Sequence, residues 1–106
     1  MATPRTVFRP ALAATANIDV SSSSQAVSLA VTGKQQVRVM NNGTATAWVN
    51  FGPSTVTASL TTGFPVGPGV TEVLSIEDLG TSVTQYAAAI AAGSTGKIYF
   101  TPGQGV

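Results

Sequence analysis

Residues 36–52 read Gln-Val-Arg-Val-Met-Asn-Asn-Gly-Thr-Ala-Thr-Ala-Trp-Val-Asn-Phe-Gly, and this stretch decides the fold. Two runs of alternating residues, 37–39 and 48–51, flank a turn at 41–43. Asn-Gly between β-forming residues is the strongest short-range hairpin signal, because both residues tolerate a positive φ. The stretch therefore predicts a hairpin at the centre of a small all-β domain.

The alternation also assigns faces to the two strands of this hairpin. Val37 and Val39 point one way, and we expect Val49 and Phe51 to be buried on the return strand. Trp48, the single tryptophan, would then be half buried against a loop or a partner. A wholly internal Trp48 is the alternative.

The rest of the chain gives further strand signals at roughly ten-residue spacing, which is typical of a sandwich or a barrel. We expect seven or eight short antiparallel strands, including 17–20, 25–31, 70–76, 81–92 and 97–101. The alanine run in 81–92 is too short for a stable helix, so we expect a buried strand with small side chains.

Turns and loops follow from glycine and proline. Residues 61–69 hold three glycines and two prolines, and this density of breakers predicts a surface loop without a strand. Phe64 within it would cover the core or contact another chain. Residues 94–96 are expected to close a hairpin into 97–101, and residues 102–106 to form a glycine-rich tail.

The domain organisation is an extended N-terminal arm, 1–16, followed by a β-sandwich domain, 17–106. Pro4 and Pro10 exclude a continuous helix in the arm and interrupt any targeting signal. Phe8 and Leu12 are the large apolar residues of the arm. They would pack on their own domain or dock on a neighbouring subunit.

Charged residues make up 8% of the 106 residues, against roughly 25% in a typical soluble domain. Either a Thr/Ser/Asn-coated surface keeps the domain soluble, or an assembly covers much of the surface; we favour the assembly. The net charge of +1 and the scattered basic residues argue against nucleic-acid binding. The longest apolar runs are far shorter than a membrane span.

The chain has no histidine and no cysteine, so the commonest general base and the thiolate ligands are missing. Its four acids are Asp19, Glu72, Glu77 and Asp78. Glu77 and Asp78 are expected as turn residues, and Glu72 as a partner of Arg38 or Lys97 or of a group on another subunit. We expect no enzyme activity, no metal and no cofactor.

Beyond residue chemistry, the order of several segments is informative. The run from Gln36 is followed by Ser-Thr-Val-Thr-Ala at 54–58, Phe-Pro-Val-Gly-Pro-Gly-Val-Thr-Glu-Val at 64–73, Tyr-Ala-Ala-Ala-Ile-Ala at 86–91 and Lys-Ile-Tyr-Phe-Thr-Pro-Gly-Gln-Gly at 97–105. Together these segments resemble small virion proteins of tailed bacteriophages. The resemblance rests on turn and strand spacing and leaves the arm outside it.

The resemblance implies a β-sandwich, with a jelly roll as one form, that binds the outside of a phage capsid as a cement or decoration protein. The implied partners are the major capsid protein and further copies of the chain, as a dimer or trimer. Aromatic residues are favoured over Lys and Glu at such interfaces. The candidate contact residues are Phe8, Arg9, Leu12, Trp48 and Phe64, with packing inside the domain as the alternative for each.

Two other functions stay open. One is a β module of the phage tail, neck or fibre. The other is a glycan-binding β-sandwich in which Trp48 or Tyr86 stacks on sugars.

Overall fold

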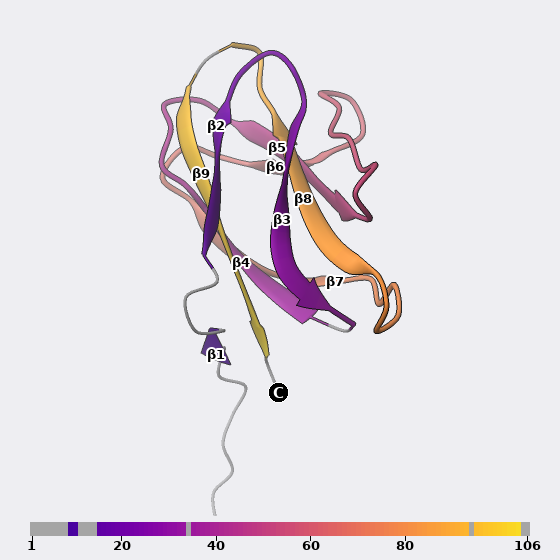
Figure 1. Cartoon of the computed structure of the whole chain (residues 1–106). Coiled ribbons are helices and arrows are strands. Elements are labelled where there is room, and N and C mark those ends of the chain that lie inside the picture. Colours follow the sequence, from indigo (N-terminus) through magenta and orange to yellow (C-terminus); the bar gives the residue numbers. More distant parts are fainter. Residues whose placement is uncertain (1–8, 11–14, 34, 94, 105–106) are drawn as a thin grey trace, which may run out of the picture.

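The computed structural model describes residues 9–10, 15–33, 35–93 and 95–104, which form two facing β-sheets (Figure 1). The strands are β1 (Arg9–Pro10), β2 (Ala16–Val20), β3 (Gln25–Thr32), β4 (Gln35–Asn41), β5 (Ala47–Gly52), β6 (Phe64–Val66), β7 (Thr71–Ile76), β8 (Thr84–Ile90) and β9 (Gly96–Gln104). All pairings are antiparallel. The expected all-β sandwich is confirmed, with eight strands from β2 to β9 and the two-residue β1.

The two sheets have a nested strand order. The β9 sheet runs β1-β9-β4-β7, with β2 also paired to β9, and the β8 sheet runs β3-β8-β5-β6. Along the chain, β2 pairs with β9, β3 with β8, β4 with β7 and β5 with β6. Early strands thus pair with late ones around a central β5–β6 connection. We infer a jelly-roll topology from this nesting.

The predicted hairpin at residues 41–43 is wrong, because β4 lies in the β9 sheet and β5 in the β8 sheet. None of these three residues has a positive φ, so the turn is not of the hairpin type. The buried Asn41 side chain instead donates to the carbonyl oxygens of Ala45 (2.9 Å) and Val66 (2.8 Å). Its Oδ1 accepts from the Gly43 amide at 2.9 Å. The amide side chain therefore holds a crossover between the sheets.

The core lies between the inner faces of the two sheets. Val37, Val39 and Phe100 come from the β9 sheet and are fully buried, as the alternation predicts. The ring of Phe51 from β5 meets that of Phe100 edge-on at 5.9 Å between centroids, although Phe51 itself is half buried. Val49 is buried as expected.

The alanine run forms the predicted buried strand, β8. Ala87 and Ala89 share the inner face with Leu29 of β3 in the core. Ala88 faces the other side and is also fully buried. It pairs with Asn50, whose Nδ2 donates to the Thr57 carbonyl oxygen of the loop 53–63 at 3.1 Å. Small side chains thus let structure pack on both faces of β8.

Three further expectations need correction. Residues 61–69 contain the strand β6, which tolerates Pro65 because β6 is an edge strand. β8 and β9 lie in different sheets, so the hairpin expected between them is wrong. β9 continues to Gln104, into the expected tail.

Candidate functional site: a groove at the open edge of the sandwich

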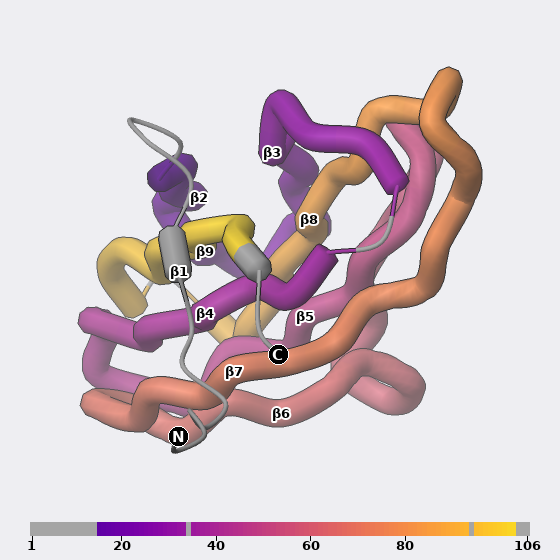
Figure 2. The backbone as a smooth tube through the Cα atoms, turned by 90° about the horizontal axis from the view of Figure 1, so that it is seen from below, coloured from indigo at the N-terminus to yellow at the C-terminus, as the bar shows by residue number. Residues whose placement is uncertain are grey.

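One side of the sandwich is left open by the shortness of β6. In Figure 2 β6 and β7 both lie along this side of the sandwich, while β2 and β3 lie along the other. β6 pairs with β5 only from Ala47 to Val49, so the last three residues of β5 have no strand beside them at this edge. β7 is likewise the last strand of its sheet. The two edges border an open groove of about 500 Å³.

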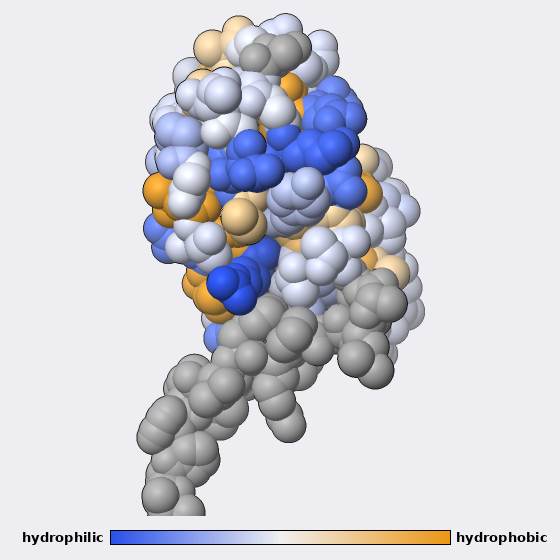
Figure 3. Space-filling view, turned by 90° about the vertical axis from the view of Figure 1, so that its left-hand side faces the viewer, coloured by the Kyte–Doolittle hydropathy of each residue, from blue (hydrophilic) through white to orange (hydrophobic). Residues whose placement is uncertain are grey.

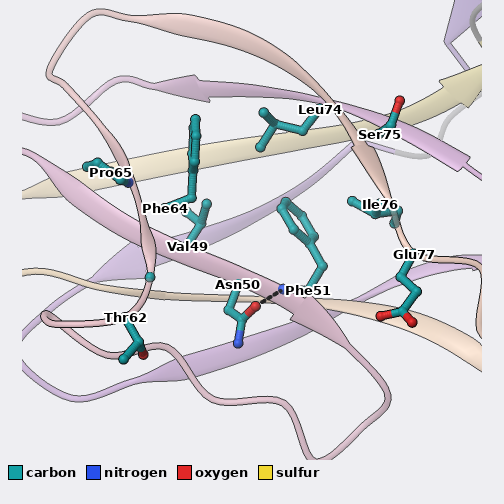
Figure 4. Close-up of a pocket in the computed structure, with 11 residues that line it drawn as sticks. Val49, Asn50, Phe51, Thr62, Phe64, Pro65, Leu74, Ser75, Ile76 and Glu77 are labelled. Carbon is teal, nitrogen blue, oxygen red and sulfur yellow. Dashed lines mark hydrogen bonds between the residues drawn. The ribbon is translucent and has the colours of Figure 1, made fainter.

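Six apolar side chains line the groove, two from each of three strands: Val49 and Phe51 of β5, Phe64 and Pro65 of β6, and Leu74 and Ile76 of β7. The pairing of Val49 with Phe64 places Phe64 on the inner face of the β8 sheet. Its ring is nevertheless 43% exposed, because β6 ends the sheet there. In Figure 4 Phe51, Phe64 and Leu74 lie in the space between β5, β6 and β7. The groove is therefore an exposed extension of the core.

The rim of the groove is polar and acidic. Asn50, Thr62 and Glu77 point away from the apolar group in Figure 4. Asp78 follows Glu77, and its Oδ1 accepts from the Gly80 amide at 2.9 Å, which fits the expected turn. Glu72 on β7 is exposed as well.

The predicted partners of Glu72 are not found among the described residues. Lys97 bonds to Asp19 instead, with 2.8 Å between Nζ and Oδ1. These two residues are directly opposite each other on β9 and β2. The hydrogen bond and the charge of Asp19 raise the pKa of Lys97 above the ordinary 10.5. The acids beside the groove thus have no cation partner within the part of the chain that the structure describes.

The structure places the five candidate contact residues in different environments. Phe64 lies in the groove. Trp48 is half buried on the opposite face of the β8 sheet, where the backbone of Gly63 packs against it. Arg9 belongs to β1 and pairs with Gln104. Phe8 and Leu12 lie outside the described residues.

Three groove residues were not singled out from the sequence: Phe51, Leu74 and Ile76. Their apolar character and spacing identify them as core-facing, which is correct as far as it goes. The partial exposure of Phe51 and Leu74 depends on which strands end each sheet, and no local pattern carries that information. The strand of Phe64 was hidden by the surrounding glycines and prolines.

A second, smaller concavity of about 360 Å³ lies on the outer face of the β9 sheet, lined by Thr15, Arg38, Met40, Tyr99 and Thr101. Met40, which lines this pocket, is 44% exposed, and Val73 on the neighbouring strand β7 is 47% exposed. Figure 3, which shows the side facing left in Figure 1, has hydrophilic and hydrophobic residues intermixed. Scattered exposed apolar residues of this kind are usual on protein surfaces.

The described residues contain no group of three or more acidic, histidine or cysteine side chains that could hold a metal ion. They also include no helix of the length and hydropathy that membrane crossing requires. Comparison of the chain with protein-family models, curated proteins and solved structures finds no match. The chemistry of the groove, which is apolar contact beside acidic groups, is therefore the basis for a functional proposal.

Proposed function

We propose that the chain is a non-enzymatic structural protein of a phage virion, which binds the outside of the capsid and stabilises the contacts between capsid subunits. The proposal combines the resemblance of residues 36–105 to phage virion proteins with one structural observation. That observation is the exposed apolar groove around Phe64 on an otherwise charge-poor sandwich.

The physical properties of the domain support such a role. A cement protein has to transmit load between capsid subunits, which requires a rigid body. Antiparallel sheets joined through a packed core, with the Phe51–Phe100 contact between them, meet this requirement. A surface with few charges also loses little hydration when a partner covers it. Exposed aromatic groups such as Phe64 are typical anchors of protein interfaces.

The test is binding to expanded heads of the phage that encodes the chain, measured by co-sedimentation and by imaging of the particles. We expect saturable occupancy at regular positions on the head. Heads carrying the protein should resist heat or loss of divalent cations better than bare heads. Absence of binding to both expanded and unexpanded heads would contradict the proposal.

A companion variant lacks residues 1–8 and keeps β1 and β2 intact. If the arm contributes to docking, head occupancy falls while the circular dichroism spectrum stays that of the full chain. Undiminished occupancy would remove the arm from the mechanism.

The same imaging tests the tail, neck or fibre function, and a glycan array tests the glycan-binding function. Density confined to the tail, neck or fibres would favour a different virion module. Glycan binding requires an accessible ring, and Trp48 is half buried under the loop that contains Gly63. Binding on a glycan array that is lost in Tyr86→Ala would favour the glycan function, since Tyr86 lines a shallow pocket with Ser82 and Thr84.

A further inference from the structure

The groove leaves several apolar side chains accessible to solvent within the described chain. Phe64 is 43% exposed, and Phe51 and Leu74 beside it are only half buried. An apolar concavity with a polar rim is the usual form of a protein interaction site. The charges around the groove and on the arm indicate which partner fits.

Three of the four acids of the chain lie on β7 or directly after it: Glu72, Glu77 and Asp78. The first nine residues carry two of the five basic residues, Arg5 and Arg9, and no acid. The groove and the arm are therefore complementary in charge. Such complementarity favours encounter and fixes the orientation of the two surfaces.

The positions of β1 and β7 exclude binding of Phe8 in the groove of its own chain. In the β9 sheet they lie at opposite edges, separated by β9 and β4. With about 4.8 Å between neighbouring strands, β1 is roughly 14 Å from β7. Phe8 is bonded to Arg9, and consecutive Cα atoms are about 3.8 Å apart. Phe8 therefore cannot enter the groove of its own chain.

We propose that the groove binds residues 5–9 of a second copy of this chain, with Phe8 beside Phe64 and the arginines facing the acidic rim. The contact joins one edge of the sandwich to the opposite edge of the next copy. Because the arm and the groove lie at opposite edges, the contact is head-to-tail. Repeated head-to-tail contacts give either a closed ring or an open filament, and the proposal specifies a closed ring of three or more copies. The inference goes beyond the proposed function, and it specifies a geometry for the self-association that the resemblance implies.

The first test measures the mass of the full-length chain in solution by native mass spectrometry and light scattering. We expect a closed ring, and Phe64→Ser should raise its dissociation constant by at least about tenfold through lost apolar burial. Met40→Ser is the matched control, because Met40 is exposed to the same extent on the outer face; this variant should assemble normally. Phe8→Ser should weaken assembly as Phe64→Ser does. Circular dichroism confirms that each variant is folded.

A charge exchange tests the orientation of the contact. Arg5→Glu and Glu77→Arg should each weaken the ring, and the double variant should recover part of the loss because the charges are again opposite. A monomeric full-length chain, an isologous dimer, or a ring that is insensitive to both Phe8→Ser and Phe64→Ser would overturn the proposal. A double variant that is no better than the single ones would also overturn it.

Binding to phage heads is a separate measurement, so the two proposals can fail independently. Rings that do not bind heads contradict the proposed function and support the head-to-tail contact. A monomer that binds heads through Phe64 overturns the self-association and indicates a capsid segment in the groove.

Discussion

At position 41 a single amide side chain connects the β4–β5 loop to strand β6. Asn41 is fully buried, and its Nδ2 donates to Ala45 and to Val66 while Oδ1 accepts from Gly43. An isolated buried amide would be destabilising, but one with its donors and acceptor paired fixes the geometry around it. Gln85 does the same at another crossover, donating to the carbonyl oxygens of Gly33 (3.1 Å) and Glu77 (2.8 Å).

We predict that Asn41→Ala lowers the free energy of unfolding by about 2–3 kcal/mol, because it leaves the buried Val66 carbonyl without its side-chain donor. Asn42→Ala is the control, since Asn42 is exposed and should change stability by less than about 0.5 kcal/mol. Denaturant unfolding measures both. Equal stabilities of the two variants would contradict the role of Asn41.

The pair of Lys97 and Asp19 gives a pH-dependent prediction. Asp19 raises the pKa of Lys97, so the stabilisation from the pair is fully present below pH 10.5 and is lost as pH rises through the folded-state pKa. Both side chains are largely exposed, which keeps the effect on stability small. Asp19→Asn should move the Lys97 titration to lower pH by NMR, while Asp78→Asn should not. Identical Lys97 titrations in wild type and Asp19→Asn would refute the pairing.

At the scale of elements, two crossovers support each other. The β4–β5 connection lies against the β8–β9 connection. Two backbone hydrogen bonds join them: the Thr44 N–H donates to the Thr95 carbonyl oxygen and the Asn42 N–H donates to the Lys97 carbonyl oxygen, both at 2.9 Å. Gly43 and Gly96 allow this close approach: a Cβ on Gly43 would lie 2.7 Å from the Thr95 carbonyl oxygen. Gly96 also has a φ of 121°, which favours glycine.

Gly43→Ala should therefore destabilise the protein by about 1–3 kcal/mol, since the backbone of Thr95 has to move. Gly93→Ala is the matched control: a Cβ there meets no atom within 4 Å, and the expected effect runs from neutral to a gain of up to about 1 kcal/mol. Thermal unfolding of the two variants compares them directly. A Gly43→Ala protein as stable as Gly93→Ala would show that the crossovers are not tightly packed.

The elements also show how far sequence patterns reach. Period-two alternation correctly placed Val37 and Val39 on one face and Val49 in the core, because a strand face depends only on parity. Strand partners were misassigned at 41–43 and 94–96, where a local turn signal competes with bonds to distant residues. Phe64 was named as a contact candidate, but its groove could not be predicted because it depends on strand order.

At the scale of the molecule, the nested pairing joins residues that are far apart in the chain. Ala16 pairs with Phe100 and Gln25 with Ala89, so most pairings require large loops to close first. Proteins dominated by such contacts fold slowly, because the entropy of loop closure opposes each pairing.

We predict that the chain refolds in milliseconds to seconds, as other all-β sandwiches do. Stopped-flow fluorescence of Trp48 measures this rate. The six prolines add slower phases of tens of seconds, which a prolyl isomerase accelerates and thereby distinguishes. Complete refolding within microseconds would be inconsistent with the nested topology.

The pairing of Arg9 with Gln104 has a practical consequence for protein engineering. Because the first and last described strands are neighbours, a short linker that joins position 104 to position 9 is geometrically compatible with the fold. New ends could be opened in the loop 53–63, between β5 and β6. Such a circular permutant would keep every strand pairing while moving both termini to the β5–β6 end of the sandwich, where a fused peptide could be displayed.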